Sequence, residues 1–189
     1  MADTKQRILD AARDLFAAQG VQKTSLREIA DRLGISKPAL YYHFSSREDL
    51  VRSIIQPVLD GGEQFLLQYE AKTPVDKRAL LDGYFDFHYV HRKDIILFVQ
   101  ELSTLSELGV IELVLAWRGR VAAMLLGPEP TLADSVRATI ALGGLQDCTV
   151  EFANVPQDEL RKVAVDAAWA TLGFEENPEN QNRTRSTSV

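Results

Sequence analysis

The sequence has little with which to build a cross-linked or membrane-bound protein. Its single cysteine, Cys148, allows neither an intramolecular disulfide nor a cysteine-rich zinc site. No apolar run approaches the roughly 20 residues that span a bilayer, and the first residues lack the basic-then-apolar pattern of a secretory signal. We therefore expect a cytoplasmic protein with no membrane partner.

Motifs for catalysis and for cofactor binding are lacking as well. The sequence contains no glycine-rich phosphate loop, nucleophile elbow or HExxH pair. His88 and His91 lie at helical spacing, but two imidazoles are too few for a metal site, and no carboxylate–histidine repeat completes the set. We expect no cofactor, no metal ion and no catalytic residue.

The balance of charge differs between the two parts of the chain. Residues 1–55 hold nine lysines and arginines against seven acidic residues, whereas the remaining 134 residues hold twelve against twenty. Phosphate binding depends on the local patch more than on the net charge of −6. An acidic protein with a basic N-terminal part can therefore bind a polyanion.

Apolar residues recur at the spacing of α-helices along most of the chain. A first helix is predicted over residues 4–19. Thr24 or Ser25 can cap a second helix, and Gly34 can end it in the left-handed conformation. Ser36 can cap a short third helix. Two short helices joined by a turn of about three residues that contains glycine are typical of the helix-turn-helix motif.

The third helix has one apolar side and one side suited to DNA. Ile35, Leu40 and Phe44 can pack on the preceding helix. The opposite side carries a cation, a methyl group and polar-tipped rings, from Lys37, Ala39, Tyr41, Tyr42 and His43. Such groups can bind base edges, a thymine methyl and phosphates in a major groove. The alternative, a helical hairpin with exposed aromatic residues, explains two tyrosines and a histidine outside a core poorly.

Residues 24–44, with the sequence TSLREIADRLGISKPALYYHF, resemble the DNA-binding signature of the TetR (tetracycline-repressor) family. Residues 45–50 resemble the start of that family's fourth helix, and the resemblance covers about residues 4–55. It implies phosphate contacts from Ser25, Tyr41, His43 and Arg47. It also implies base-edge contacts from Arg27, Lys37, Pro38, Ala39 and Tyr42. Together with the cap Ser36, these residues form the predicted DNA-binding set.

One departure from the family pattern concerns the turn after the third helix. This turn often carries a lysine in the family, whereas here it reads Ser45-Ser46-Arg47. Arg47 is then the only basic group there for the phosphate backbone. We expect a weaker electrostatic contribution to DNA binding.

The fourth helix continues the apolar periodicity to about Tyr69, interrupted by Pro57 and by Gly61-Gly62. In the family, this helix links the DNA-binding head to the ligand-binding body. The interruption is therefore either a hinge or an irregularity. Five further helices are predicted over residues 77–93, 94–108, 110–126, 131–154 and 156–173.

The expected fold is all-α: a three-helix head with the helix-turn-helix, followed by a helical ligand-binding and dimerisation bundle, about nine helices in all. The expected domains are residues 1–50 for DNA binding and residues 51–174 for ligand binding and dimerisation. Residues 175–189 are polar and are predicted to be disordered.

The predicted ligand site is a cavity among the fifth to eighth helices. Pockets of this kind are mostly apolar and contain a few placed polar groups. The candidates are Phe65, Tyr84, Phe87, His88, Phe98, Glu101, Trp117 and Gln146. For any one of them, ordinary core packing or surface exposure is the alternative.

The helices of residues 131–173 are rich in small residues, which let helices approach closely, and they resemble the family's dimer interface. The alternative is an intramolecular hairpin that packs on the body. We therefore expect a homodimer that binds a palindromic double-stranded DNA operator. The predicted function is a transcriptional regulator, by default a repressor, released from the operator by a small-molecule effector. An enzyme body fused to a DNA-binding head, or a ligand-independent DNA-binding protein, are the alternatives.

Overall fold

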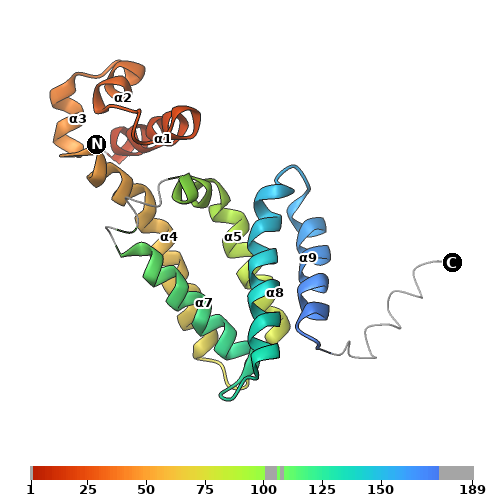
Figure 1. The fold of residues 1–189 in the computed structure, drawn as a ribbon. Helices are drawn as coiled ribbons and strands as arrows, with labels where there is room; N and C mark the ends of the chain where they lie inside the picture. The colour runs from red at the N-terminus through yellow and green to blue at the C-terminus, as the bar shows by residue number, and fades with distance from the viewer. Residues whose placement is uncertain (1, 101–105, 107–108, 175–189) are drawn as a thin grey trace.

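The computed structural model describes residues 2–100, 106 and 109–174, and within these ranges the chain is helical and has no strand. The predicted all-α fold is confirmed. Figure 1 shows the helices in chain order: α1 (Ala2–Gln19), α2 (Leu26–Leu33), α3 (Lys37–His43), α4 (Arg47–Glu70), α5 (Lys77–Gln100), α7 (Val110–Leu126), α8 (Leu132–Glu151) and α9 (Gln157–Thr171).

The helices α1–α3, which we call the head, form a small core with the first part of α4. Ile8, Phe16, Ile29, Leu40 and Leu50 are almost completely buried there. Each fully buried side chain of this size stabilises the fold by about 1.5–3 kcal/mol. The head therefore has a hydrophobic core of its own, which positions α2 and α3.

The remaining helices, which we call the body, enclose a second core. Leu66 of α4, Phe85 of α5, Leu125 of α7, Leu142 of α8 and Val165 of α9 are all at most 1% exposed. In Figure 1, α4 and α7 run side by side on one side of the body, and α8 and α9 form a hairpin on the other. No helix among the described residues is long and apolar enough to cross a membrane.

Helix α4 belongs to both cores and leads from the head into the body (Figure 1). Helix α4 runs from Arg47 to Glu70 without ending at Pro57 or at Gly61-Gly62, and a hinge at these residues stays a prediction. Pro57 removes one backbone donor, but the buried Ile54 and Val58 on either side of it keep the helix packed.

The predicted helix boundary at Asp94 is wrong, because α5 continues through it to Gln100. Asp94 does not cap a new helix; its Oδ1 accepts a hydrogen bond from Arg13 Nε of the head at 2.9 Å. Most of the predicted helix beyond position 100, and all of residues 175–189, lie outside the described residues. Helix α8 ends at Glu151, three residues before the predicted end at 154, and a turn follows.

Candidate functional site

The helices of the α2–turn–α3 unit begin at side-chain caps. Ser25 Oγ accepts from the Glu28 N–H at 3.2 Å, and the Glu28 carboxylate accepts from the Ser25 N–H at 2.7 Å. Gly34 ends α2 at φ +64°, which glycine adopts without strain. Ser36 Oγ accepts from the Ala39 N–H at 3.3 Å and starts α3. The turn that sets the angle between the two helices is thus fixed locally.

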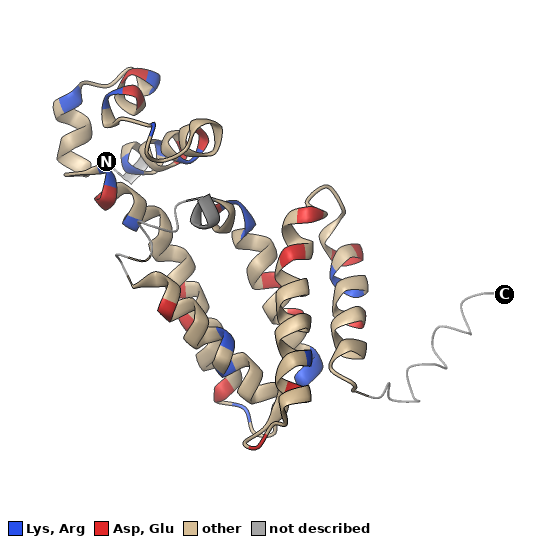
Figure 2. Ribbon diagram, viewed as in Figure 1, with Lys and Arg blue, Asp and Glu red and all other residues tan. Residues whose placement is uncertain are grey.

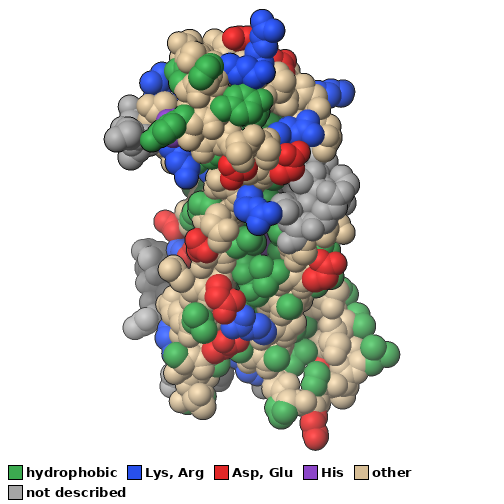
Figure 3. All heavy atoms as spheres, turned by 90° about the vertical axis from the view of Figure 1, so that its left-hand side faces the viewer, with side chains coloured by type: hydrophobic (Ala, Val, Ile, Leu, Met, Phe, Trp, Pro, Cys, Tyr) green, Lys and Arg blue, Asp and Glu red, His purple; other side chains and the backbone are tan. Residues whose placement is uncertain are grey.

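Helix α3 has a buried side and an exposed side, as predicted. Leu40 is fully buried and Phe44, the cap residue, is 1% exposed, whereas Tyr42 is 77% exposed. The exposed side also carries Lys37, Pro38, Ala39 and Tyr41. Figure 2 marks basic residues along the ribbon of the head, and Figure 3 shows basic side chains on one face of the head with hydrophobic ones between them.

Ring contacts order the exposed side of α3. Lys37 Nζ lies 5.4 Å from the centroid of the Tyr41 ring, a cation–π contact that holds the amine beside the helix. The Tyr42 and His43 rings meet edge to face at 5.2 Å. The head therefore presents a cation and phenolic hydroxyls from one short helix, a combination suited to base edges and phosphates.

The remaining predicted DNA-binding residues lie at the edges of this unit. Arg27 is exposed on α2, 3.6 Å from Asp31. The Arg47 guanidinium donates to the Gln22 carbonyl oxygen at 3.1 Å and to Gln22 Oε1 at 3.0 Å. Arg47 thus fastens the start of α4 to the loop before α2, a structural role that the sequence did not indicate.

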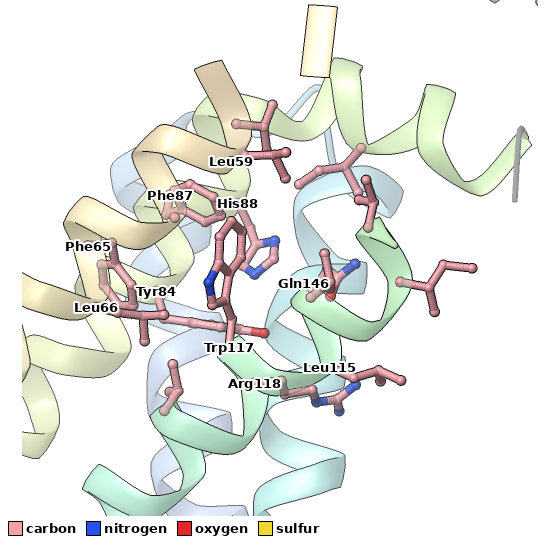
Figure 4. Close-up of a pocket in the computed structure, with 17 residues that line it drawn as sticks. Leu59, Phe65, Leu66, Tyr84, Phe87, His88, Leu115, Trp117, Arg118 and Gln146 are labelled. Atoms are coloured by element: carbon pink, nitrogen blue, oxygen red, sulfur yellow. The ribbon is translucent and has the colours of Figure 1, made fainter. Parts of the chain in front are cut away.

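A cavity of about 230 Å³ lies in the body between α4, α5, α7 and α8. Its wall is mostly aliphatic and aromatic, and Figure 4 shows side chains from these helices around it. Six of the eight predicted ligand-binding residues line it: Phe65, Tyr84, Phe87, His88, Trp117 and Gln146. The Phe98 side chain and Glu101 lie outside the described residues.

Other residues of this wall were not predicted. Leu59 and Gly62 come from the helix that links head and body, and Val114 and Arg118 come from α7. The sequence signal for α7 was its high apolar content, which core packing explains equally well. The close fit of Gly62 could not be predicted, because it depends on where α7 lies: a Cβ there would be 2.4 Å from Trp117 Cζ3.

The most unusual polar group in the cavity wall is His88. Its side chain is buried between the rings of Tyr84, at a centroid distance of 4.4 Å, and Phe87, at 5.3 Å. Its Nδ1 has no hydrogen-bond partner among the described residues. Burial, together with repulsion from His91 and Arg118, lowers the pKa of His88 to about 3, so the imidazole is neutral at pH 7.

Comparison with known proteins identifies the head. The family model for bacterial regulatory proteins, tetR family, matches residues 8–54. The HTH-type transcriptional regulator AcrR of Shigella flexneri is 40% identical over 79 residues, 42% of this chain and 37% of that protein. The HTH-type transcriptional repressor KstR2 of Mycolicibacterium smegmatis is 31% identical over 117 residues, 60% of this chain and 57% of that protein. Residues 8–54 therefore match the tetR-family domain of such regulators.

The similarity also extends to the body. A transcriptional regulator from Aquifex aeolicus VF5 has a TM-score of 0.68 and 26% identity, covering 87% of this chain and 96% of that one. The matches to the two curated relatives cover about two fifths and three fifths of their length. The likeness over the whole length of the chain is therefore one of fold.

A polar cluster joins the cavity wall to the outer side of α4. Trp117 Nε1 donates to Glu63 Oε2 at 3.1 Å. Arg120 bridges Glu63 at 2.9 Å and Glu70 at 2.7 Å, and its hydrogen bonds hold the pKa of both carboxyls below their usual range. Trp117 of the cavity wall is therefore hydrogen-bonded to α4, the helix that leads to the head.

The outer face of the α8–α9 hairpin is apolar and exposed. On α8, Leu132 is 81%, Val136 48% and Ile140 59% exposed, at four-residue spacing, and Gly144 continues the stripe. On α9, Val163 is 63% exposed. These exposed apolar residues lie within the predicted dimer segment, residues 131–173.

Proposed function

We propose that the protein is a DNA-binding transcriptional regulator, a repressor that a small-molecule effector releases from a palindromic operator. The observation that carries this proposal is the α2–turn–α3 unit, in which Leu40 and Phe44 anchor α3 while Lys37, Tyr41 and Tyr42 face outward. A recognition helix in a helix-turn-helix enters the major groove with its N-terminal residues on base edges. AcrR and KstR2, by their names, are transcriptional regulators.

In this proposal residues 1–50 read DNA, and residues 51–174 bind the effector and form a homodimer. The exposed apolar stripe of α8 and α9 supports pairing through residues 131–173. Two heads held at a fixed distance match two half-sites of an operator. Because the proposed target is DNA of the cell, we propose the cytoplasm as its location. We assign no catalytic reaction to the body.

The effector acts, in this proposal, through α4. The cavity wall includes Val58, Leu59 and Gly62 of α4, while Leu50 and Ile54 of the same helix lie in the core of the head. A ligand that displaces the cavity wall would shift α4 and change the spacing of the two heads. It can move this equilibrium only by its differential affinity for the two states, typically about 1–3 kcal/mol.

The proposal is tested by selecting DNA from a random pool with the full chain and measuring binding to the selected operator and to random DNA. Lys37→Ala should weaken operator binding by about 1–3 kcal/mol and relax sequence preference. Lys72→Ala, an exposed lysine of the turn after α4, is the matched control and should change neither. If Lys37→Ala loses the same affinity for the operator and for random DNA, Lys37 contacts phosphates and does not read base edges. Failure to enrich any sequence would overturn the proposed function.

A further inference from the structure

The cavity in the body combines an apolar wall with one buried polar group that has no partner. The His88 ring lines the cavity, and in Figure 4 it points into the same space as the Gln146 side chain of α8. A buried nitrogen without a hydrogen bond is destabilising, so it favours any ligand that supplies one. We propose that the cavity binds an uncharged, mainly apolar molecule that presents one hydroxyl group to His88. This inference rests on the proposed effector site.

The hydroxyl follows from the chemistry of a neutral imidazole. One ring nitrogen then donates and the other accepts, and a half-turn of the ring exchanges nitrogen and carbon positions. A hydroxyl can donate to one nitrogen or accept from the other, so it satisfies His88 in either arrangement. A carbonyl or ether oxygen can only accept.

The absence of a charge on the ligand follows from the rest of the wall. Arg118 is the one charged residue among the residues described as lining the cavity. Its guanidinium donates to the backbone carbonyl of Thr139 and lies against α8 at Gly143, where a Cβ would be 2.9 Å from it. A carboxylate in the cavity would lose its water in an otherwise apolar wall and would have to draw this guanidinium away from the Thr139 carbonyl to pair with it.

The volume limits the size of the ligand. A cavity of about 150 Å³ is known to hold benzene, so the 230 Å³ here fits a molecule of about ten non-hydrogen atoms. The ring stack of Phe65 and Phe87, with centroids 6.1 Å apart, and the neighbouring Trp117 favour an aromatic ring in this space. An alkylphenol meets all of these requirements.

The test uses two probes of equal size, 4-propylphenol and 4-propyltoluene, in which a methyl group replaces the hydroxyl. Calorimetric titration of the DNA-free full chain gives both dissociation constants, and their ratio measures the preference for the hydroxyl. In His88→Phe this preference should fall about tenfold, whereas binding of 4-propyltoluene should persist. In His88→Gln, which keeps a hydrogen-bonding group, part of the preference should return.

The inference is overturned if His88→Phe keeps the full preference for the hydroxyl. It is also overturned if neither probe binds to the wild-type protein. A third outcome would be that 4-propylbenzoate binds more tightly than 4-propylphenol and that Arg118→Met abolishes the binding of 4-propylbenzoate. This outcome would overturn the inference and indicate an anionic ligand. Because these measurements contain no DNA, they fail independently of operator recognition. If the protein selects an operator but does not bind 4-propylphenol, only this inference is overturned and the proposed function stands.

Discussion

Arg13 of α1 donates from Nε to Asp94 Oδ1 of α5 at 2.9 Å, which joins the head to the body across 81 positions of sequence. Their side chains are 26% and 16% exposed, so water screens this pair less than the surface pairs of the head. Apart from α4, this ion pair is a direct polar link between the two parts. It lies on the helix that also carries His88 and His91.

The first prediction is that Arg13 and Asp94 are energetically coupled. A double-mutant cycle with Arg13→Gln and Asp94→Asn, measured by urea unfolding, should give a coupling of about 1 kcal/mol. The matched control is the Arg27–Asp31 pair, 3.6 Å apart with side chains 80% and 69% exposed, which should give no more than about 0.3 kcal/mol. Equal couplings for the two pairs would contradict the role of the Arg13–Asp94 contact.

The second prediction concerns the close approach of α4 and α7. Gly62→Ala places a methyl group 2.4 Å from the Trp117 ring, so it should destabilise the fold by about 1–3 kcal/mol although alanine favours helix. Gly119→Ala, at an exposed site of α7 with no atom within 4 Å of the added Cβ, should instead stabilise by about 0.5–1 kcal/mol. Thermal unfolding measures both. A stabilising Gly62→Ala would show that Trp117 moves freely.

Much of the head could be predicted from sequence because its signals are local. Ser25 and Ser36 act within one turn of their own position, and Leu40 and Phe44 follow helical periodicity. The same reasoning failed at Asp94, where a residue that often caps helices accepts instead from Arg13. That partner lies 81 positions away, and no local pattern could indicate it.

The cavity was predictable in part for a related reason. Tyr84, Phe87 and His88 are clustered on one helix, so polar groups among aromatic residues marked it. The contributions of Gly62 and Arg118 depend on how α4 and α7 pack, which the sequence alone does not determine. Likewise, Arg47 was predicted from its position in a motif, whereas its bonds to Gln22 required the folded loop.

The third prediction links His88 to acid stability. The unfolded chain takes up a proton on His88 near pH 6.5, whereas the folded chain does so only near its pKa of about 3. Protonation therefore favours the unfolded state as the pH falls below 6.5. The free energy of unfolding should decrease by about 2 kcal/mol between pH 6.5 and pH 5 through His88 alone.

Urea unfolding between pH 8 and pH 5 should show this loss in the wild-type protein and a smaller loss in His88→Phe. Burial also lowers the pKa of His91, so part of the acid sensitivity should remain in the variant. His88→Gln, which does not titrate, should behave like His88→Phe. Identical pH dependence in all three proteins would mean that folding leaves the pKa of His88 unchanged.

The last prediction is that the apolar stripe of α8 holds two copies of the chain together. Gly144 is exposed on this stripe, and nothing lies within 4 Å of an added Cβ, so Gly144→Glu should leave the single chain folded and put a charge into the interface. Ile140→Glu, at a site 59% exposed, should act in the same way. Val90→Glu, on α5 and 66% exposed, is the matched control outside the stripe and should remain dimeric. Light scattering at micromolar concentration measures the mass.

The two interface variants should also lose far more affinity for a selected operator than for random DNA, because only paired heads match paired half-sites. A wild-type monomer, or dimeric Ile140→Glu with full operator affinity, would place the assembly surface elsewhere.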